Sequence, residues 1–160
     1  MAVVTHEVEV PTAVSAAKMF KVFLKESDTI LPTILPAFIK NVEVLEGNGG
    51  PGTVKKLNFA EGNDFKYLIT RIDSMDEENL ACSYTRFDGE PWMETLEKVC
   101  YDEKVIPTPD GGSICQSIVK YYPKGDAKID EEVLKAGHDR IMGVFKVIEA
   151  YLLANPDAFN

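Results

Sequence analysis

The alternation of apolar and polar residues predicts a chain built mainly of β-strands. From Val42 to Val119, apolar side chains recur at nearly every second position, which is the spacing of strands with one buried face. Short segments rich in Gly, Asn, Asp and Pro separate these runs, so successive strands are expected to pair as antiparallel hairpins. The predicted strands are Val3–Val10, Val42–Glu46, Thr53–Ala60, Phe65–Met75, Asn79–Phe87, Met93–Ile106 and Ser113–Tyr121.

Two short helices are predicted between the first and second strands. Ser15 is a favourable N-cap for a helix over Ala16–Lys25. Pro32 and Pro36 bracket a second helix over Thr33–Phe38. Because proline interrupts helical hydrogen bonding, a bent pair of helices is expected here and not one long element.

A long helix is predicted near the C-terminus. Asp130 is a favourable N-cap, and the helix should continue to Ala154, before Asn155 and Pro156 stop it. At 1.5 Å per residue such a helix is roughly 35 Å long, enough to cross a small domain. Its apolar stripe contains Gly137, Ile141, Val144, Ile148, Tyr151 and Leu152.

This order of elements predicts one α+β domain over residues 1–160. A seven-stranded antiparallel sheet needs a cover on one face, and the long last helix can supply it. We therefore expect a curved sheet wrapped on that helix, with the two short helices supporting one end.

One face of the predicted sheet combines aromatic and polar side chains, which favours a cavity over a dry core. Buried polar groups without partners are unfavourable by about 1–3 kcal/mol each. The helix above offers Ala136, Gly137 and Gly143, which fill little space. A hydrated pocket is therefore expected, with the alternative that Lys55 and Arg86 extend to the rim of the sheet. The face is expected to contain Lys55, Leu57, Phe59, Phe65, Tyr67, Ile69, Cys82, Tyr84, Arg86, Val99, Tyr101, Cys115 and Ser117.

The partner expected in this pocket is a small hydrophobic molecule. The predicted ligand-binding residues are Phe23, Ile39, Lys55, Leu57, Phe59, Tyr67, Ile69, Cys82, Tyr84, Arg86, Tyr101, Gly137, Arg140 and Ile141.

Composition and charge exclude several other classes of function. The net charge of −9 disfavours binding to nucleic acid or to an anionic membrane. No apolar run approaches the ~20 residues that span a bilayer, and no signal peptide is evident. The three cysteines are widely spaced, as free thiols in a reducing compartment would be, so a cytoplasmic location is expected. No cofactor and no metal site is expected, and the protein is expected to be a monomer or a weak dimer.

The loop Gly47-Asn48-Gly49-Gly50-Pro51-Gly52 formally matches the GxGxxG pattern of dinucleotide-binding proteins. A dinucleotide loop opens a helix, whereas a strand is predicted after this loop. It is also not a Walker loop, because Thr53 and not Lys follows Gly52. Two interpretations remain, an anion-binding nest of backbone N–H groups and a purely structural turn formed by Gly47, Gly49, Gly50 and Gly52.

Catalytic roles are conceivable for a few ionisable side chains. Glu97 and Glu149, with Lys55 and Tyr151, could supply an acid, a base and a cation for phosphodiester cleavage if they converge. A surface salt bridge of Glu97 with Lys98 or a neighbour explains that glutamate equally well or better. His138 lies beside the apolar stripe of the last helix and is expected to be structural or solvated.

Several segments together resemble one plant family. The chain is similar to the pathogenesis-related class 10 proteins, the birch pollen allergen (Bet v 1) family, over nearly its whole length. The matching segments are Glu46 to Thr53 with Lys55-Lys56, Lys120-Tyr121, Lys124-Gly125-Asp126, Lys135-Ala136-Gly137 and Glu149 to Pro156.

The resemblance implies a helix-grip (START-like) fold of seven strands, two short helices and one long helix around a large hydrophobic cavity. It also implies a cytosolic, stress-induced and often allergenic protein that binds flavonoids, cytokinins, sterol-like molecules or fatty acids. A weak ribonuclease activity is claimed for some members, and the residues proposed for it correspond here to Lys55, Glu97, Glu149 and Tyr151.

The chain departs from the family pattern at positions that bear on the ligand. Cys82 and Arg86 occupy wall positions that are often aromatic or aliphatic, and Asn48 replaces the usual Asp. The gate and latch motifs of the related abscisic acid receptors are absent, which disfavours a receptor. A carrier of small metabolites is the leading hypothesis, with three alternatives: a ribonuclease, a pocket enzyme using Lys55 and Tyr67, and a regulatory partner in hormone signalling.

Overall fold

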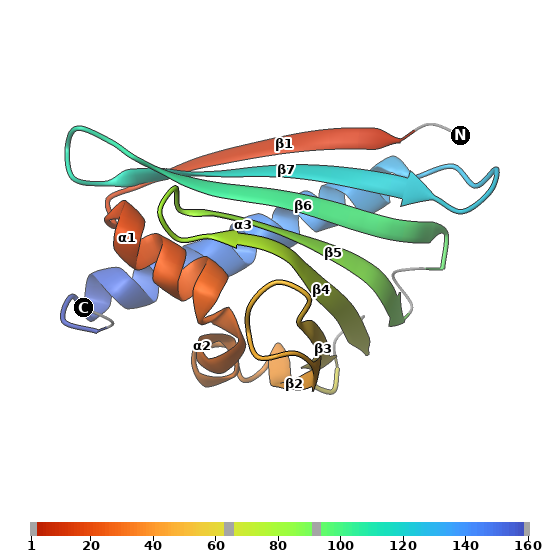
Figure 1. The fold of residues 1–160 in the computed structure, drawn as a ribbon, viewed down its shortest axis with the longest axis horizontal. Coiled ribbons are helices and arrows are strands. Elements are labelled where there is room, and N and C mark those ends of the chain that lie inside the picture. Colours follow the sequence, from red (N-terminus) through yellow and green to blue (C-terminus); the bar gives the residue numbers. More distant parts are fainter. Residues whose placement is uncertain (1–2, 63–65, 91–93, 159–160) are drawn as a thin grey trace.

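Seven antiparallel strands form one curved sheet, and helices cover its concave face (Figure 1). The computed structural model describes residues 3–62, 66–90 and 94–158. The strand order is β1-β7-β6-β5-β4-β3-β2, so the first strand lies beside the last. The elements are β1 (Val4–Thr12), α1 (Ala16–Met19), a π-helical segment η1 (Phe20–Lys25), α2 (Ser27–Ile34), β2 (Ile39–Glu46), β3 (Val54–Phe59), β4 (Tyr67–Asp76), β5 (Ala81–Glu90), β6 (Leu96–Pro107), β7 (Ser113–Pro123) and α3 (Glu131–Ala154).

The predicted order of elements and fold class are confirmed, with shifts at the ends of strands. β2 begins three residues before the predicted start at Val42, and β5 and β7 end later than predicted. The predicted starts of two strands, Phe65 and Met93, lie outside the described residues.

The prediction for the second short helix was wrong. α2 begins at Ser27, six residues before the predicted start, and contains Pro32 in its interior. Proline removes one N–H, so Pro32 leaves only the carbonyl of Asp28, in the first turn, without its helical donor. That loss is tolerable in so short a helix. The break between the two short helices therefore falls at Glu26, whose carbonyl accepts from Thr29 and Ile30.

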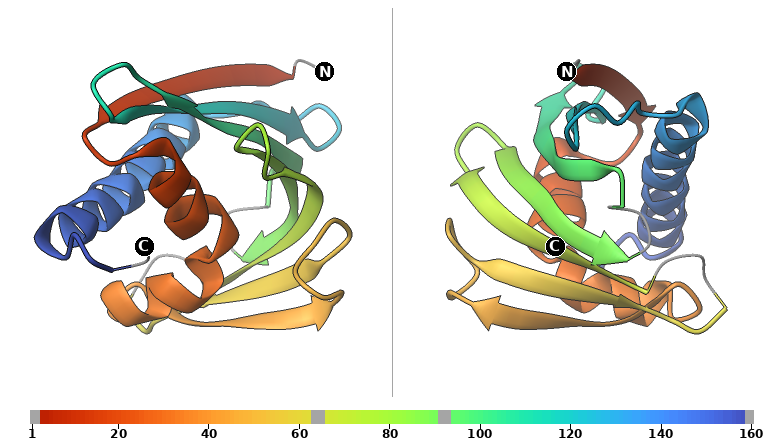
Figure 2. Two further views of the ribbon diagram at one scale, coloured as in Figure 1. Left: turned by 60° about the vertical axis from the view of Figure 1, so that its left-hand side comes forward. Right: turned by 90° about the vertical axis from the view of Figure 1, so that its right-hand side faces the viewer.

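α3 lies across the open side of the sheet, as both views in Figure 2 show. Its start follows the predicted capping chemistry, since the Asp130 side chain accepts from the backbone N–H of Glu132 at 3.1 Å. Glu131 and Glu132 place negative charge in the first turn, where the helix dipole favours it. The helix ends at Ala154, also as predicted.

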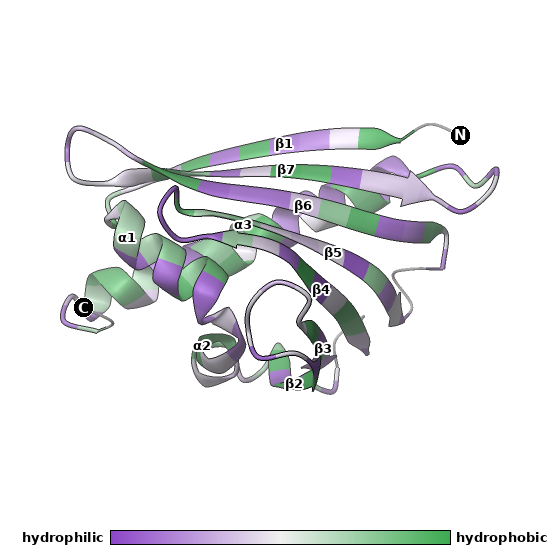
Figure 3. Cartoon of the chain, viewed as in Figure 1, coloured by the Kyte–Doolittle hydropathy of each residue, from purple (hydrophilic) through white to green (hydrophobic). Residues whose placement is uncertain are grey.

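Two groups of buried apolar residues hold the helices on the sheet. One joins β1, α1 and η1 to the C-terminal half of α3 through Met19, Phe20, Phe145 and Ile148. The other joins the middle strands to the N-terminal half of α3 through Leu68, Val99, Val119 and Tyr121. Strand residues alternate accordingly between apolar and polar along the sheet in Figure 3.

α3 lies in tight contact with the sheet at Gly137. A Cβ atom built on Gly137 would lie 2.5 Å from the hydroxyl oxygen of Tyr121. Tyr121 is almost completely buried on β7, so its ring has little room to move. Burial also raises the pKa of Tyr121 to about 12. Only glycine lets the helix axis lie at this height above the sheet.

Replacing Gly137 by alanine is expected to destabilise the fold by about 1–3 kcal/mol, because the new methyl group must displace a buried tyrosine or the helix. Urea unfolding measures the change. Gly143→Ala is the matched control, because it lies on the same helix and faces open space. It should stabilise the protein by about 0.5–1 kcal/mol through helix propensity. Equal effects of the two substitutions would contradict the proposed contact.

Candidate functional site

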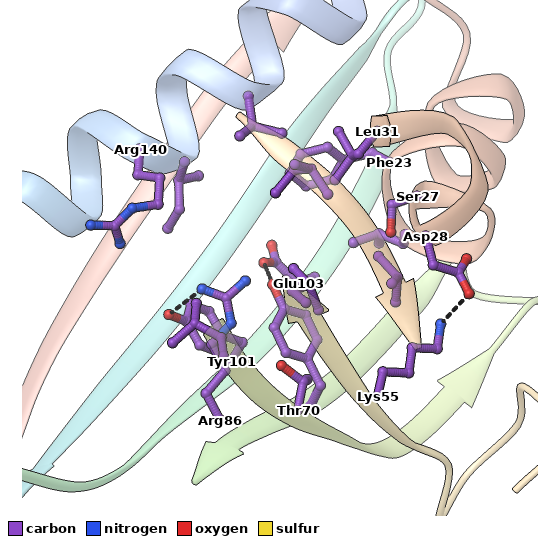
Figure 4. A pocket seen from close by; sticks show the side chains of 18 of the residues that line it. Phe23, Ser27, Asp28, Leu31, Lys55, Thr70, Arg86, Tyr101, Glu103 and Arg140 are labelled. Atoms are coloured by element: carbon purple, nitrogen blue, oxygen red, sulfur yellow. Dashed lines mark hydrogen bonds and ion pairs between the residues drawn. The ribbon is translucent and has the colours of Figure 1, made fainter. Parts of the chain in front are cut away.

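A cavity of about 150 Å³ lies between the sheet and the helices. Its walls come from η1, α2, the five strands β2 to β6, and α3 (Figure 4). Both groups of core residues contribute to the wall, for example Phe23 and Cys82 from one and Phe59 and Tyr101 from the other. The cavity therefore lies where the two packed regions meet without filling the space between them.

Most of the predicted ligand-binding residues line this cavity. Tyr67 and Ile69 do not, and the predicted orientation of β4 was wrong. Leu68, Thr70 and Ile72 face inward instead, whereas Lys56 lies over the ring of Tyr67 outside the cavity. The predicted residues on the wall are Phe23, Ile39, Lys55, Leu57, Phe59, Cys82, Tyr84, Arg86, Tyr101, Gly137, Arg140 and Ile141.

Charged and polar residues of the wall were missed. Glu103 follows Val99 and Tyr101 in the inward alternation of β6, so its position could have been read from the sequence. Ser27 and Asp28 were assigned to no element because α2 was placed too late. Thr70 was assigned to the wrong face of β4.

A cluster of tyrosine and arginine forms one wall. Tyr84 and Tyr101 are cross-strand partners on β5 and β6, and their rings stack with centroids 4.7 Å apart. The guanidinium carbon of Arg86 lies 4.9 Å from the ring centroid of Tyr101 and 5.8 Å from that of Tyr84. One Arg86 nitrogen also donates to the Tyr101 hydroxyl at 3.4 Å. These contacts fix the direction in which the guanidinium points.

Glu103 is a buried carboxyl on the same wall. The Tyr84 hydroxyl donates to one of its oxygens at 2.8 Å, and the Ser117 hydroxyl donates to the other. Burial raises the pKa of Glu103, and the two hydrogen bonds and the charge of Arg86 offset only part of that rise. Burial likewise raises the pKa of Tyr84 well above its usual value.

An ion pair lies on the cavity wall beside α2. Lys55 Nζ on β3 lies 3.0 Å from a carboxylate oxygen of Asp28. Both side chains are largely buried and both line the wall (Figure 4). The alternative that Lys55 and Arg86 leave the cavity for the sheet rim is therefore not what the structure shows.

The glycine-rich loop connects β2 to β3, and its N–H groups are used within the protein. Gly47, Gly49 and Gly52 have positive φ angles. Gly49 donates to the Thr53 hydroxyl at 2.9 Å, and Gly52 donates to the carbonyl of Ile72 at 2.7 Å. The first bond holds the loop together and the second anchors it to β4, which fits the structural interpretation better than an anion nest.

The four residues named for ribonuclease activity do not share one site. Of these described residues, only Lys55 lines the cavity. Glu97 is exposed on β6, and Glu149 lies 3.6 Å from Lys146 on α3. Tyr151 packs against the core beside η1. The Nδ1 atom of His138, which was expected to be structural or solvated, lies 3.2 Å from Nε2 of His6 on β1.

The wall offers neither a metal site nor a reactive thiol. Within the ranges 3–62, 66–90 and 94–158, no three His, Cys, Asp or Glu side chains are grouped to hold a metal ion. Burial raises the pKa of Cys82 to about 11 and that of Cys115 to about 12. Neither thiol is a nucleophile near neutral pH. The wall is therefore suited to binding through apolar contact, ring stacking and hydrogen bonds.

Comparison with known proteins identifies relatives over the whole chain. Residues 1–155 match the model of the pathogenesis-related protein Bet v 1 family. The chain is 44% identical to the major allergen Pru ar 1 of Prunus armeniaca over 160 residues, which is 100% of both chains. It is 43% identical to the major pollen allergen Bet v 1-B of Betula pendula over the same length.

Solved structures share the fold. The crystal structure of Ara h 8.0201 is 38% identical, with a TM-score of 0.88 over 96% of this chain and 100% of that one.

Cys82 is expected to react slowly with iodoacetamide in the native protein. At pH 8 a thiol with pKa about 11 is about 100-fold less ionised than one at the ordinary value of 9.0. Its thiolate fraction, and hence its labelling rate, should rise about tenfold per pH unit up to that pKa. Mass spectrometry of labelled peptides measures this, with the urea-unfolded chain as control. Equal rates in folded and unfolded protein at pH 8 would contradict the burial of this thiol.

Proposed function

The chain belongs to the pathogenesis-related protein Bet v 1 family, and from this premise we propose that it is a carrier of small amphiphilic molecules. The observation that carries the proposal is the cavity between the sheet and α3, whose wall is apolar except for a few fixed polar groups. Cavities of this kind hold a ligand by burying its apolar surface and orient it through a small number of hydrogen bonds.

The distribution of wall residues supports a ligand with two chemically different ends. Leu57, Phe59 and Ile39 give one side of the cavity an apolar surface. On β5 and β6, Arg86 and Glu103 add hydrogen-bonding groups that are held by tyrosines. Flavonoids, cytokinins, sterol-like molecules and fatty acids, the ligand classes implied by the family resemblance, all combine an apolar body with polar ends.

A carrier accounts for the wall better than an enzyme does. The ribonuclease hypothesis needs Glu97 and Glu149 beside Lys55, but only Lys55 faces the cavity. A pocket enzyme that uses Lys55 and Tyr67 would need the Tyr67 phenol inside the cavity, but Tyr67 lies outside it. Lys55 also forms an ion pair with Asp28, and this pair holds the Lys55 ammonium group beside α2.

The proposed setting is the cytoplasm of a plant cell, where the carrier would act during stress or defence. The free cysteines fit a reducing compartment. In the part of the chain that the structure describes, no helix has both the length and the apolar character needed to cross a bilayer.

Filling the cavity should abolish binding of a neutral apolar probe. N-phenyl-1-naphthylamine, whose fluorescence rises in apolar surroundings, is expected to bind the wild-type protein. Leu57→Trp adds an aromatic ring to a wall with little spare volume and should weaken binding by at least about tenfold, or 1.4 kcal/mol. Fluorescence titration measures both dissociation constants.

Leu153→Trp provides the matched control, because it makes the same exchange of leucine for tryptophan. Leu153 lies on α3 beyond its last wall residue, Val144, and its side chain is 55% exposed. The same ring added there should leave binding unchanged. The carrier proposal would be wrong if the wild-type protein bound no probe, or if both tryptophan variants bound as tightly as the wild type.

A further inference from the structure

Three polar side chains form a row across the inner face of the sheet. Lys55 on β3 is the cross-strand partner of Thr70 on β4, and Thr70 is the cross-strand partner of Arg86 on β5. All three line the cavity (Figure 4). Directly opposed residues on one face have Cβ atoms about 5 Å apart, so the Thr70 hydroxyl lies between two cationic side chains.

Two atoms of this row are buried without a partner. Thr70 Oγ1 and Arg86 Nε have no hydrogen-bond partner among the residues that the structure describes. A guanidinium keeps its charge at any physiological pH, and a buried donor without an acceptor is unfavourable. Since the two atoms belong to neighbouring residues on one wall, a single acceptor group placed beside them would satisfy both.

The acidic groups of the cavity are engaged elsewhere. The two oxygens of Glu103 accept hydrogen bonds from Tyr84 and Ser117. Asp28 is paired with Lys55. No ion pair within 4 Å joins Arg86 to a carboxylate among the described residues, so the charge of Arg86 is held by aromatic rings and the Tyr101 hydroxyl.

The charge balance inside the cavity is opposite to that of the whole protein. Lys55, Arg86 and Arg140 line the wall against Asp28 and Glu103, which is three basic against two acidic side chains. The chain as a whole carries a net charge of −9. The wall thus carries more basic than acidic side chains although the chain as a whole is acidic.

We propose that the cavity selects ligands with a carboxylate, whose oxygens accept from Arg86 Nε and from the Thr70 hydroxyl. This inference rests on the proposed carrier function and names its ligand class: small apolar molecules with one carboxylate. The carboxylate supplies the counter-charge that Arg86 lacks, through charge-assisted hydrogen bonds. The apolar body of the ligand then lies along Leu57, Phe59 and Ile141.

The stacked tyrosines give the site its rigidity. Arg86 is held against Tyr101, which is itself stacked on Tyr84, and Tyr84 donates to buried Glu103. A guanidinium held in this way loses little freedom when it binds an anion. Arg86 is thus a specificity-determining residue.

The test compares trans-cinnamate with trans-cinnamamide, which have nearly the same shape and differ in charge. Isothermal titration at pH 7 should show that the wild-type protein binds cinnamate about tenfold or more tightly than the amide. In Arg86→Met the preference should disappear, with the amide bound as before. Thr70→Val, which keeps the shape of the side chain, should reduce the preference by about threefold.

Two further variants test whether the preference for cinnamate depends on charges inside the cavity and not on charges elsewhere. Arg71→Met removes an arginine from β4 that points outward and lies 2.8 Å from Asp73, and it should keep the full preference. Glu103→Gln removes the nearest negative charge while its amide can still bond to Tyr84 and Ser117, and it should strengthen cinnamate binding.

The outcomes separate failure of the carboxylate site from failure of the carrier function on which it rests. Equal affinity for cinnamate and cinnamamide in the wild-type protein, or an undiminished preference in Arg86→Met, overturns the carboxylate site. If N-phenyl-1-naphthylamine still binds in that case, the carrier function stands. If neither cinnamate, cinnamamide nor the naphthylamine binds, the carrier proposal itself is wrong.

Discussion

The contact between Gly137 and Tyr121 determines how close α3 lies to the sheet, and the cavity depends on it. Towards its C-terminus the helix carries Phe145, Ile148 and Leu152, which are large enough to fill the space above β1 and η1. Around Gly137 it presents Arg140 and Ile141 instead, and these line the wall without closing it. One helix held at one height therefore gives a packed core at one end and a cavity at the other. The sheet that the helix crosses is curved, as Figure 2 shows.

Much of the fold was accessible from the sequence because each element has an independent local cause. The cap at Asp130 and the two-residue alternation each predict an element without reference to the others, and their order then leaves few topologies. The prediction failed for β4, where the alternation of apolar and polar residues was compatible with either orientation of the strand. Tyr67, Leu68 and Ile69 are all apolar, so their alternation does not decide which face is buried. Arg71 and Asp73, on the same face as Tyr67, contained the answer, since charged side chains rarely face a core.

The chemistry of the site was less predictable than its location. That Arg86 and Tyr101 share a wall follows from counting strand residues, but the unpaired Nε of Arg86 does not. It depends on where the hydroxyls of Tyr84 and Ser117 point, because these occupy the Glu103 carboxylate that could otherwise have paired with the arginine. Whether Glu103 bonds to the two hydroxyls or to Arg86 depends on small differences in distance between strands that are remote in sequence. The pattern of residues along the chain does not contain these distances.

Among the described residues, Arg86 is a buried cation without an ion pair, and this links ligand binding to stability. In a solid core this arrangement would be strongly unfavourable, and a protein with spare polar atoms on its cavity wall gives up part of its stability to keep them. A ligand that satisfies Arg86 and Thr70 restores that stability when it binds, and by mass action it favours the folded state in proportion to its affinity. The wall residues that distinguish this chain are thus the ones on which folding and ligand choice both depend. A neutral ligand would fill the same space but leave the charge of Arg86 uncompensated, and this difference is the physical basis of selection.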